Sequence, residues 1–270
     1  MFNLLRMDLY RLKRSKSLYI WLAVLMAISV LCYWMVWLIN TPEGRSLAGK
    51  IDMVLTEETL TQEDLAIAEN YDLLAMFRET GMDGGGFTCI TGILAALFVC
   101  LDFHSGFMKN IMALHRDRWK YVASKLITAG ILNFFYLAVL LAFGFLLNAC
   151  FGVLVPWAGI GSIAFYMVSA WILSTAFSAL FILVILLTRS SAAGVTAALL
   201  LGSGLVQLLL LNITGLFHVT KWFDYTLYAN LTYAPTAYAG IGDWKGAATG
   251  LVFLVLYSVL GCAVLARQDI

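Results

Sequence analysis

The sequence predicts an all-α polytopic membrane protein with six transmembrane helices, and three observations support this prediction. Of the 270 residues, 62% are hydrophobic and 12% are charged, whereas soluble domains average about 25% charged residues. Apolar runs of membrane-spanning length recur along the whole chain. The basic and acidic residues are also segregated between alternate connections. A soluble core of this size could not bury so much apolar surface, so lipid must be the surrounding solvent.

The apolar runs define the expected domain organisation. We expect residues 1–270 to form a single transmembrane domain, because no polar segment is long enough to form a separate soluble domain. The first run follows a basic segment, as in a signal peptide, but it is too long and lacks a small-residue cleavage site. We therefore expect it to remain as a helix. The expected spans are 18–39, 87–103, 126–151, 162–188, 192–212 and 246–266.

The segment before the first span, 1–17, carries five Lys and Arg residues. Leu5, Leu9 and Leu12 recur in it at helical spacing, so the charged and apolar residues separate onto different faces. This pattern predicts an amphipathic N-terminal helix at the membrane interface, with anionic inner-leaflet lipid as its partner.

The connection after the first span, 40–86, is the longest polar segment, with ten acids against three bases. Thr61 is a suitable N-cap for a helix that runs to about Thr80, and Gly81 would help to end it. The segment is either an external lid or a solvated linker that only joins two spans. A second external segment, 213–245, is rich in Trp and Tyr and predicts an interfacial belt or short helices at the outer leaflet.

The connection after the second span, 102–125, reads DFHSGFMKNIMALHRDRWKYVASK and holds five Lys and Arg residues. Its periodicity predicts a short basic amphipathic helix. Such a helix can dock into a groove of a soluble partner or rest on lipid, and a solvated basic loop is the third alternative. The residues on its apolar face are Met108, Ile111, Met112, His115 and Trp119.

Charge decides the expected orientation. With six spans, both termini and the 102–125 connection lie on one side of the membrane. That side holds twelve of the seventeen Lys and Arg residues and four of the sixteen acids, giving a net charge of +8 against −7 on the other side. The positive-inside rule therefore predicts cytoplasmic N- and C-termini.

Catalytic signatures are missing from the sequence. It contains no GxxxxGK[ST], GxSxG, HExxH or CxxC motif, and its three histidines lack metal-ligand spacing. No Asp, Glu, Lys or Arg falls in the middle of an expected span, which argues against ion-coupled carriers and intramembrane proteases. We therefore predict no catalytic, cofactor or metal site in this chain. Thr88, Thr91 and Gln207 are candidates for a substrate path, although helix–helix hydrogen bonding is the commoner role of such side chains.

Several of these features together resemble a known family. They are the basic lead-in 2–16, the long connection after the first span, the basic connection 102–125 and the aromatic segment before the last span. Within 102–125, the resemblance rests on Ser105–Asn110, Arg116 or Arg118, Tyr121 and Ser124–Lys125. The layout resembles the six-span permease subunit of bacterial type-2 ABC transporters. The acidic connection 40–86 is similar to that of members that export, or give immunity to, antimicrobial peptides.

The resemblance implies a mechanism and a set of partners. Two permease copies, or two related permeases, would associate with two cytoplasmic ABC ATPase subunits, which would bind the ATP and Mg. The cargo would be an amphipathic peptide or lipid-like molecule crossing a bacterial cell membrane, with no nucleic acid involved. A non-transporting membrane adaptor or sensor with an external ligand-binding loop is the alternative. The residues that would form the ATPase-coupling helix are Phe107, Met108, Lys109, Ile111, Met112, His115, Arg116, Arg118 and Trp119.

Overall fold

The computed structural model describes residues 2–50, 72–108, 118–216 and 220–267, and every regular element in these ranges is helical. Five stretches are long and apolar enough to cross a membrane, or six if a bent helix pair is counted as one span. The predicted all-α polytopic class is therefore confirmed. The elements that supply these stretches are α2 (Lys16–Asn40), α5 (Leu73–Phe77) with α6 (Gly86–His104), α8 (Arg118–Cys150), α9 (Ile160–Thr188), α13 (Lys245–Arg267), and the bent pair α10 (Ser191–Gly202) and α11 (Leu205–Leu216).

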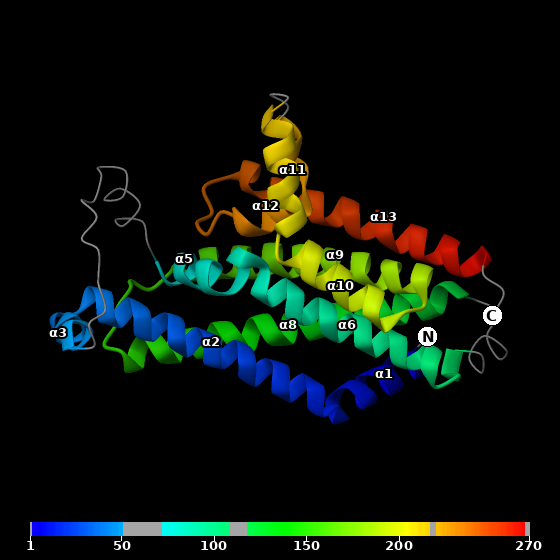
Figure 1. Cartoon of the computed structure of the whole chain (residues 1–270), viewed down its shortest axis with the longest axis horizontal. Coiled ribbons are helices and arrows are strands. Elements are labelled where there is room, and N and C mark those ends of the chain that lie inside the picture. Colours follow the sequence, from blue (N-terminus) through cyan, green and yellow to red (C-terminus); the bar gives the residue numbers. More distant parts are fainter. Residues whose placement is uncertain (1, 51–71, 109–117, 217–219, 268–270) are drawn as a thin grey trace.

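The long helices run side by side along the longest axis of the molecule (Figure 1). Helix α9 is central, since it packs against α6, α8, α10 and α13. It is apolar on all sides, as expected of a helix surrounded by other helices. Helices α2 and α13 are mostly exposed in the single chain, with apolar side chains such as Ile20 and Val255 on the outside.

The two ends of the bundle differ. Helix α1 (Phe2–Arg14), the last turn of α6, the first turns of α8 and the last turn of α13 lie at one end, which we call the terminal end (Figure 1). Helices α3 (Pro42–Lys50) and α5 lie at the opposite end. Helix α1 is the predicted amphipathic segment: Leu12 is buried, while Lys13 and Arg14 are exposed. Ser15 separates it from α2.

The C-terminal part of the connection 40–86 packs into the bundle. Thr61, the predicted N-cap, lies outside the described residues, and Asp72 caps α5 instead by accepting a 2.9 Å hydrogen bond from the Ala75 N–H. All five residues of α5 are buried. The Leu73 N–H also donates to the Pro156 carbonyl at 3.1 Å. This part of the connection is therefore integral to the core, because its apolar residues are consecutive and suit burial on all sides. The π-helical turn η1 (Arg78–Met82) and the 3₁₀ turn η2 (Asp83–Gly85) join α5 to α6.

The fifth expected span, which the sequence predicts as one helix over 192–212, consists of two helices in the structure. Helices α10 and α11 meet at an angle of 54°, and α11 leaves the bundle (Figure 1). The break contains Gly204 at φ +76°, a conformation that favours glycine. Just before it, Gly202 lies so close to α6 that a Cβ on Gly85 would fall 1.7 Å from the Gly202 carbonyl oxygen. Gly202 thus permits a close approach of two segments within the chain.

The aromatic segment before the last span forms short helices, which are η3 (Thr220–Tyr225), α12 (Leu227–Thr232) and η4 (Ile241–Trp244). Phe165 of α9 packs against two of its aromatic side chains, with ring centroids 5.4 Å from Tyr238 and 4.9 Å from Trp244. These contacts tie the segment to the central helix, so the aromatic density serves core packing as well as exposed surface.

Candidate functional site

A network of charged side chains is buried at the terminal end of the bundle. Asp8 of α1, Asp102 of α6 and Lys125 of α8 are only 2%, 0% and 2% exposed. The Lys125 ammonium lies 2.7 Å from Asp8 Oδ1 and 2.6 Å from Asp102 Oδ2. One lysine therefore bridges two carboxylates from different helices.

Three further side chains complete the network. Arg11 donates to Asp102 Oδ1 at 2.7 Å, and the Tyr121 hydroxyl donates to Asp102 Oδ2 at 3.0 Å. The Ser124 hydroxyl donates to Asp8 Oδ2 at 2.9 Å. All four carboxylate oxygens thus have donors, which is the condition under which buried charges are tolerated.

Aromatic rings surround the cations. The Lys125 ammonium lies 4.3 Å from the centroid of the Phe98 ring. The Arg11 guanidinium lies 5.1 Å from the Phe107 ring and 5.7 Å from Phe98. Cation–π attraction at these distances partly replaces the water that the cations lose on burial.

Helical spacing brings these side chains together. Asp8 and Arg11 are three residues apart and therefore share one face of α1. Tyr121, Ser124 and Lys125 follow the i, i+3, i+4 pattern and share one face of α8. Asp102 lies in the last turn of α6, facing both.

The network is balanced in charge, with two carboxylates, one lysine and one arginine. Balance matters because an unpaired charge in a low-dielectric site costs several kcal/mol. We therefore expect the network to define how α1, α6 and α8 are arranged more than to add stability. A buried ion pair by itself is weak evidence of stabilisation.

The ion network fixes both ends of the basic connection 102–125, which we call its stems. Asp102 is its first residue, near the end of α6, and Tyr121 and Lys125 lie at its other end, in the first turns of α8. Both stems are tied to α1 through Asp8 and Arg11. Arg118 adds α13, because it donates to the carbonyls of Leu265 at 2.6 Å and Ala266 at 3.0 Å. A displacement of the connection would therefore move α1, α6, α8 and α13 together.

Four of the predicted coupling residues are described, and they have contrasting environments. Met108 is 1% exposed and belongs to the apolar cluster that also contains Tyr121 and Leu265. Phe107 packs against that cluster. Arg118 and Trp119 lie in the first turn of α8, where Trp119 is 53% exposed. The other five, which lie outside the described residues, are Lys109, Ile111, Met112, His115 and Arg116.

The three substrate-path candidates are each engaged in hydrogen bonds within the chain. Thr88 is buried, and its hydroxyl donates to the Gly85 and Gly202 carbonyls at 3.0 and 3.2 Å, which links α6 to α10. Thr91, also buried, donates to the Phe87 carbonyl at 2.9 Å. Gln207 of α11 donates to the Thr226 hydroxyl beside α12. The two threonines therefore lie together on α6, while Gln207 is bound to a different part of the fold.

The sequence reasoning missed the network. It assigned Asp102 and Lys125 to a basic surface connection, but α6 and α8 extend into that connection and bury both residues. Two signals were available. Asp8 is the only acid among residues 1–17, and Tyr121, Ser124 and Lys125 have the spacing of one helical face.

Comparison with known families assigns the chain. The family model described as "ABC-2 family transporter protein" matches residues 4–204, a range that contains α2, α6, α8, α9, α10 and all of the ion network. No curated relative matches the chain. Because the match covers about three quarters of the sequence, the chain belongs to the ABC-2 transporter family and is a multi-pass permease subunit of an ABC transporter.

Proposed function

We propose that this permease exports an amphipathic peptide or lipid-like molecule across a bacterial cell membrane, driven by separate ATPase subunits. Association with ABC ATPases is implied by the family. The observation that carries the proposal is the buried ion network, which holds both stems of the basic connection against α1. A partner that grips this connection from the cytoplasm would act on four helices at once.

The physical argument starts from the missing energy source. The sequence has no P-loop, so ATP cannot bind here in the P-loop manner, and work must enter through contact with a partner. An ATPase pair that closes on ATP binding would displace the connection. The network would pass that displacement to α1, α6 and α8 as a unit, because its ion pairs are short and enclosed.

A second permease copy, or a related permease, is the proposed partner within the membrane. Helix α11 supports this, because it leaves the bundle with most of its large apolar side chains exposed. A helix pair would cover them at no cost in unsatisfied backbone groups. The exposed apolar residues on α11 are Leu205, Leu208, Leu209, Leu210 and Ile213.

The charge of the connection 40–86 supports a cationic peptide as cargo. With ten acids and three bases, it would raise the local concentration of a cationic peptide in a salt-dependent way. Aromatic residues of the 213–245 segment would accommodate the apolar face of the same peptide at the membrane interface. This charge pattern is also the basis for proposing a role in export or immunity.

Reconstitution tests the proposed function. The chain alone in liposomes is expected to hydrolyse no ATP, whereas together with its ABC ATPase it should support hydrolysis that a cationic amphipathic peptide stimulates. A neutral peptide of the same apolar content is the control. Hydrolysis by the rigorously purified chain would contradict the assignment of energy input to a partner, and stable ATPase binding without any transport would favour the adaptor.

Orientation is tested by cysteine labelling in intact cells. We propose a cytoplasmic terminal end, because the basic residues gather there. An impermeant maleimide should then label native Cys150, which is exposed at the far end of α8. In a Cys150→Ala background, it should label Glu58→Cys but not Ser17→Cys. Labelling of Ser17→Cys without Glu58→Cys would invert the topology.

A further inference from the structure

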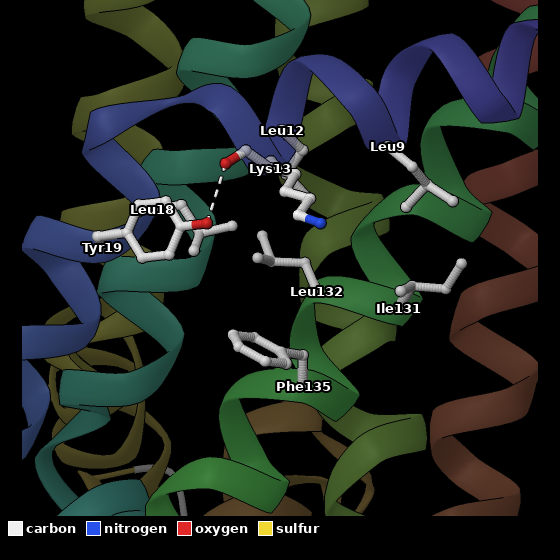
Figure 2. Close-up of a pocket in the computed structure, with 8 residues that line it drawn as sticks. All are labelled: Leu9, Leu12, Lys13, Leu18, Tyr19, Ile131, Leu132 and Phe135. Atoms are coloured by element: carbon white, nitrogen blue, oxygen red, sulfur yellow. Dashed lines mark hydrogen bonds between the residues drawn. The ribbon is translucent and has the colours of Figure 1, made fainter.

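An apolar groove lies where α1, α2 and α8 meet at the terminal end of the bundle (Figure 2). Its volume is about 340 Å³, within the roughly 300–1,000 Å³ of small-molecule sites. Helices α1 and α2 bend around it, and the bend is fixed by the Tyr19 hydroxyl, which donates to the Lys13 carbonyl at 3.0 Å. The lining residues are Leu9, Leu12, Lys13, Leu18, Tyr19, Ile131, Leu132 and Phe135.

The wall is apolar along its length and basic at one position. Leu12, Leu18 and Leu132 are 8%, 6% and 4% exposed and form the floor, while Ile131 and Phe135 of α8 remain about two-fifths exposed at the rim. Figure 2 shows the Lys13 side chain directed into the space between α1 and α8. Among the described residues, no acceptor lies within hydrogen-bond distance of its ammonium group.

The charge near this lysine has one sign. Arg14 and Lys16 follow within three residues and are exposed, whereas the only acid of α1, Asp8, is buried and bound to Lys125. The groove therefore presents a cation at its mouth with no carboxylate of α1 left to neutralise it. An anion at this position would be attracted by three basic side chains.

We propose that this groove binds one acyl chain of an anionic phospholipid, whose phosphate contacts Lys13. The apolar wall matches a hydrocarbon chain, and the bend between an interfacial helix and a spanning helix lies at the depth where headgroup and chain meet. A free phosphate would leave the apolar wall empty. An extended peptide would leave its backbone polar groups without partners along that wall, which is unfavourable.

The test is lipid retention by the full-length protein in native mass spectrometry. Delipidated protein is titrated with phosphatidylglycerol or with phosphatidylcholine of identical chains. Wild type is expected to retain phosphatidylglycerol preferentially, and Lys13→Ala should weaken that retention about fivefold, the contribution of one basic residue near anionic lipid. Arg6→Ala is the matched control, because it removes one charge from the exposed face of α1 outside the groove. Glycerol 3-phosphate should not compete, which distinguishes the lipid from a soluble phosphate.

A second variant fills the groove without changing charge. Ile131→Trp places a large side chain at the exposed rim and is expected to abolish preferential retention, whereas Val255→Trp, an exposed position on α13, should leave it unchanged. Equal retention of both lipids by wild type, or wild-type retention by both Lys13→Ala and Ile131→Trp, would overturn the proposal. Competition by glycerol 3-phosphate would also overturn it, in favour of a phosphate site. None of these readouts requires transport, so they are independent of the proposed function.

Discussion

Replacing Lys125 with methionine is expected to destabilise the protein by about 3–5 kcal/mol, because it leaves the buried Asp8 carboxylate without a cation, while Arg11 still pairs with Asp102. Methionine has a similar length, so the change removes charge more than volume. Of the network's carboxylates, Asp8 would be left with only the Ser124 hydroxyl as donor. The measurement is thermal unfolding in detergent. Unfolding is monitored through the reaction of a maleimide dye with cysteines that become accessible, such as the buried Cys100. A loss on the order of 10 °C is expected for a chain of this size.

Two further variants make the result specific to charge balance. Lys16→Met makes the same exchange at an exposed position and should change the melting temperature little. The double variant Asp8→Asn/Lys125→Met should recover most of the lost stability, because the Arg11–Asp102 pair that remains is neutral overall. Equal melting temperatures for wild type and Lys125→Met, or no recovery in the double variant, would show that the network does not depend on paired charges.

The positions of most spans could be predicted because a membrane imposes a length on apolar runs. The fourth expected span, 162–188, corresponds to α9 at Ile160–Thr188, and the last, 246–266, to α13 at Lys245–Arg267. Local residues mark both helices, since a glycine comes directly before α9 and basic residues lie at the two ends of α13. The break between α10 and α11 could not be predicted from hydropathy, since Ser203 and Gly204 hardly interrupt an apolar run. That break follows from the contact of Gly202 with α6 and from the left-handed conformation at Gly204.

The ion network could not be predicted from the sequence alone, for a different physical reason. The pairs that α1 makes join residues 91 to 117 positions apart, and local periodicity indicates which face a residue occupies without identifying its partner. Charge alone predicts the wrong environment, because Asp102 and Lys125 are the end residues of a basic connection that is expected to lie at the surface. Burial of an ionised side chain becomes favourable only when its partners are in place, which is a property of the assembled helices. The same holds for α5, whose apolar residues are buried by distant parts of the chain: Leu73 donates to the Pro156 carbonyl, and the Phe77 ring packs against Tyr166.

Substituting aspartate for Ile111 is expected to release the ATPase while the permease still inserts and folds. We propose that Ile111 lies on the apolar face of a helix that fills a partner groove. Ile111 lies outside the described residues, and the apolar stripe in the sequence together with the fixed stems to either side supports this placement. Introducing a charge at a buried interface anchor typically costs about 2–4 kcal/mol, which corresponds to roughly 30- to 1,000-fold weaker binding. The measurement is ATPase pull-down with the membrane-inserted variant, and peptide-stimulated hydrolysis in the same liposomes.

Two comparisons separate ATPase docking from a helix that only rests on lipid. Lys109→Ala should weaken ATPase binding less than Ile111→Asp and in a salt-dependent way, because a rim charge contributes mainly to the rate of encounter. If the helix rests on lipid, ATPase binding should not respond to Ile111→Asp at all. An unchanged melting temperature for Ile111→Asp would show that the ion network and the stems are intact, so that loss of ATPase binding then reports on the interface itself. Full retention of the ATPase with normal stimulated hydrolysis would remove the coupling role from the basic connection, and with it the reason why four helices need to be joined at its stems.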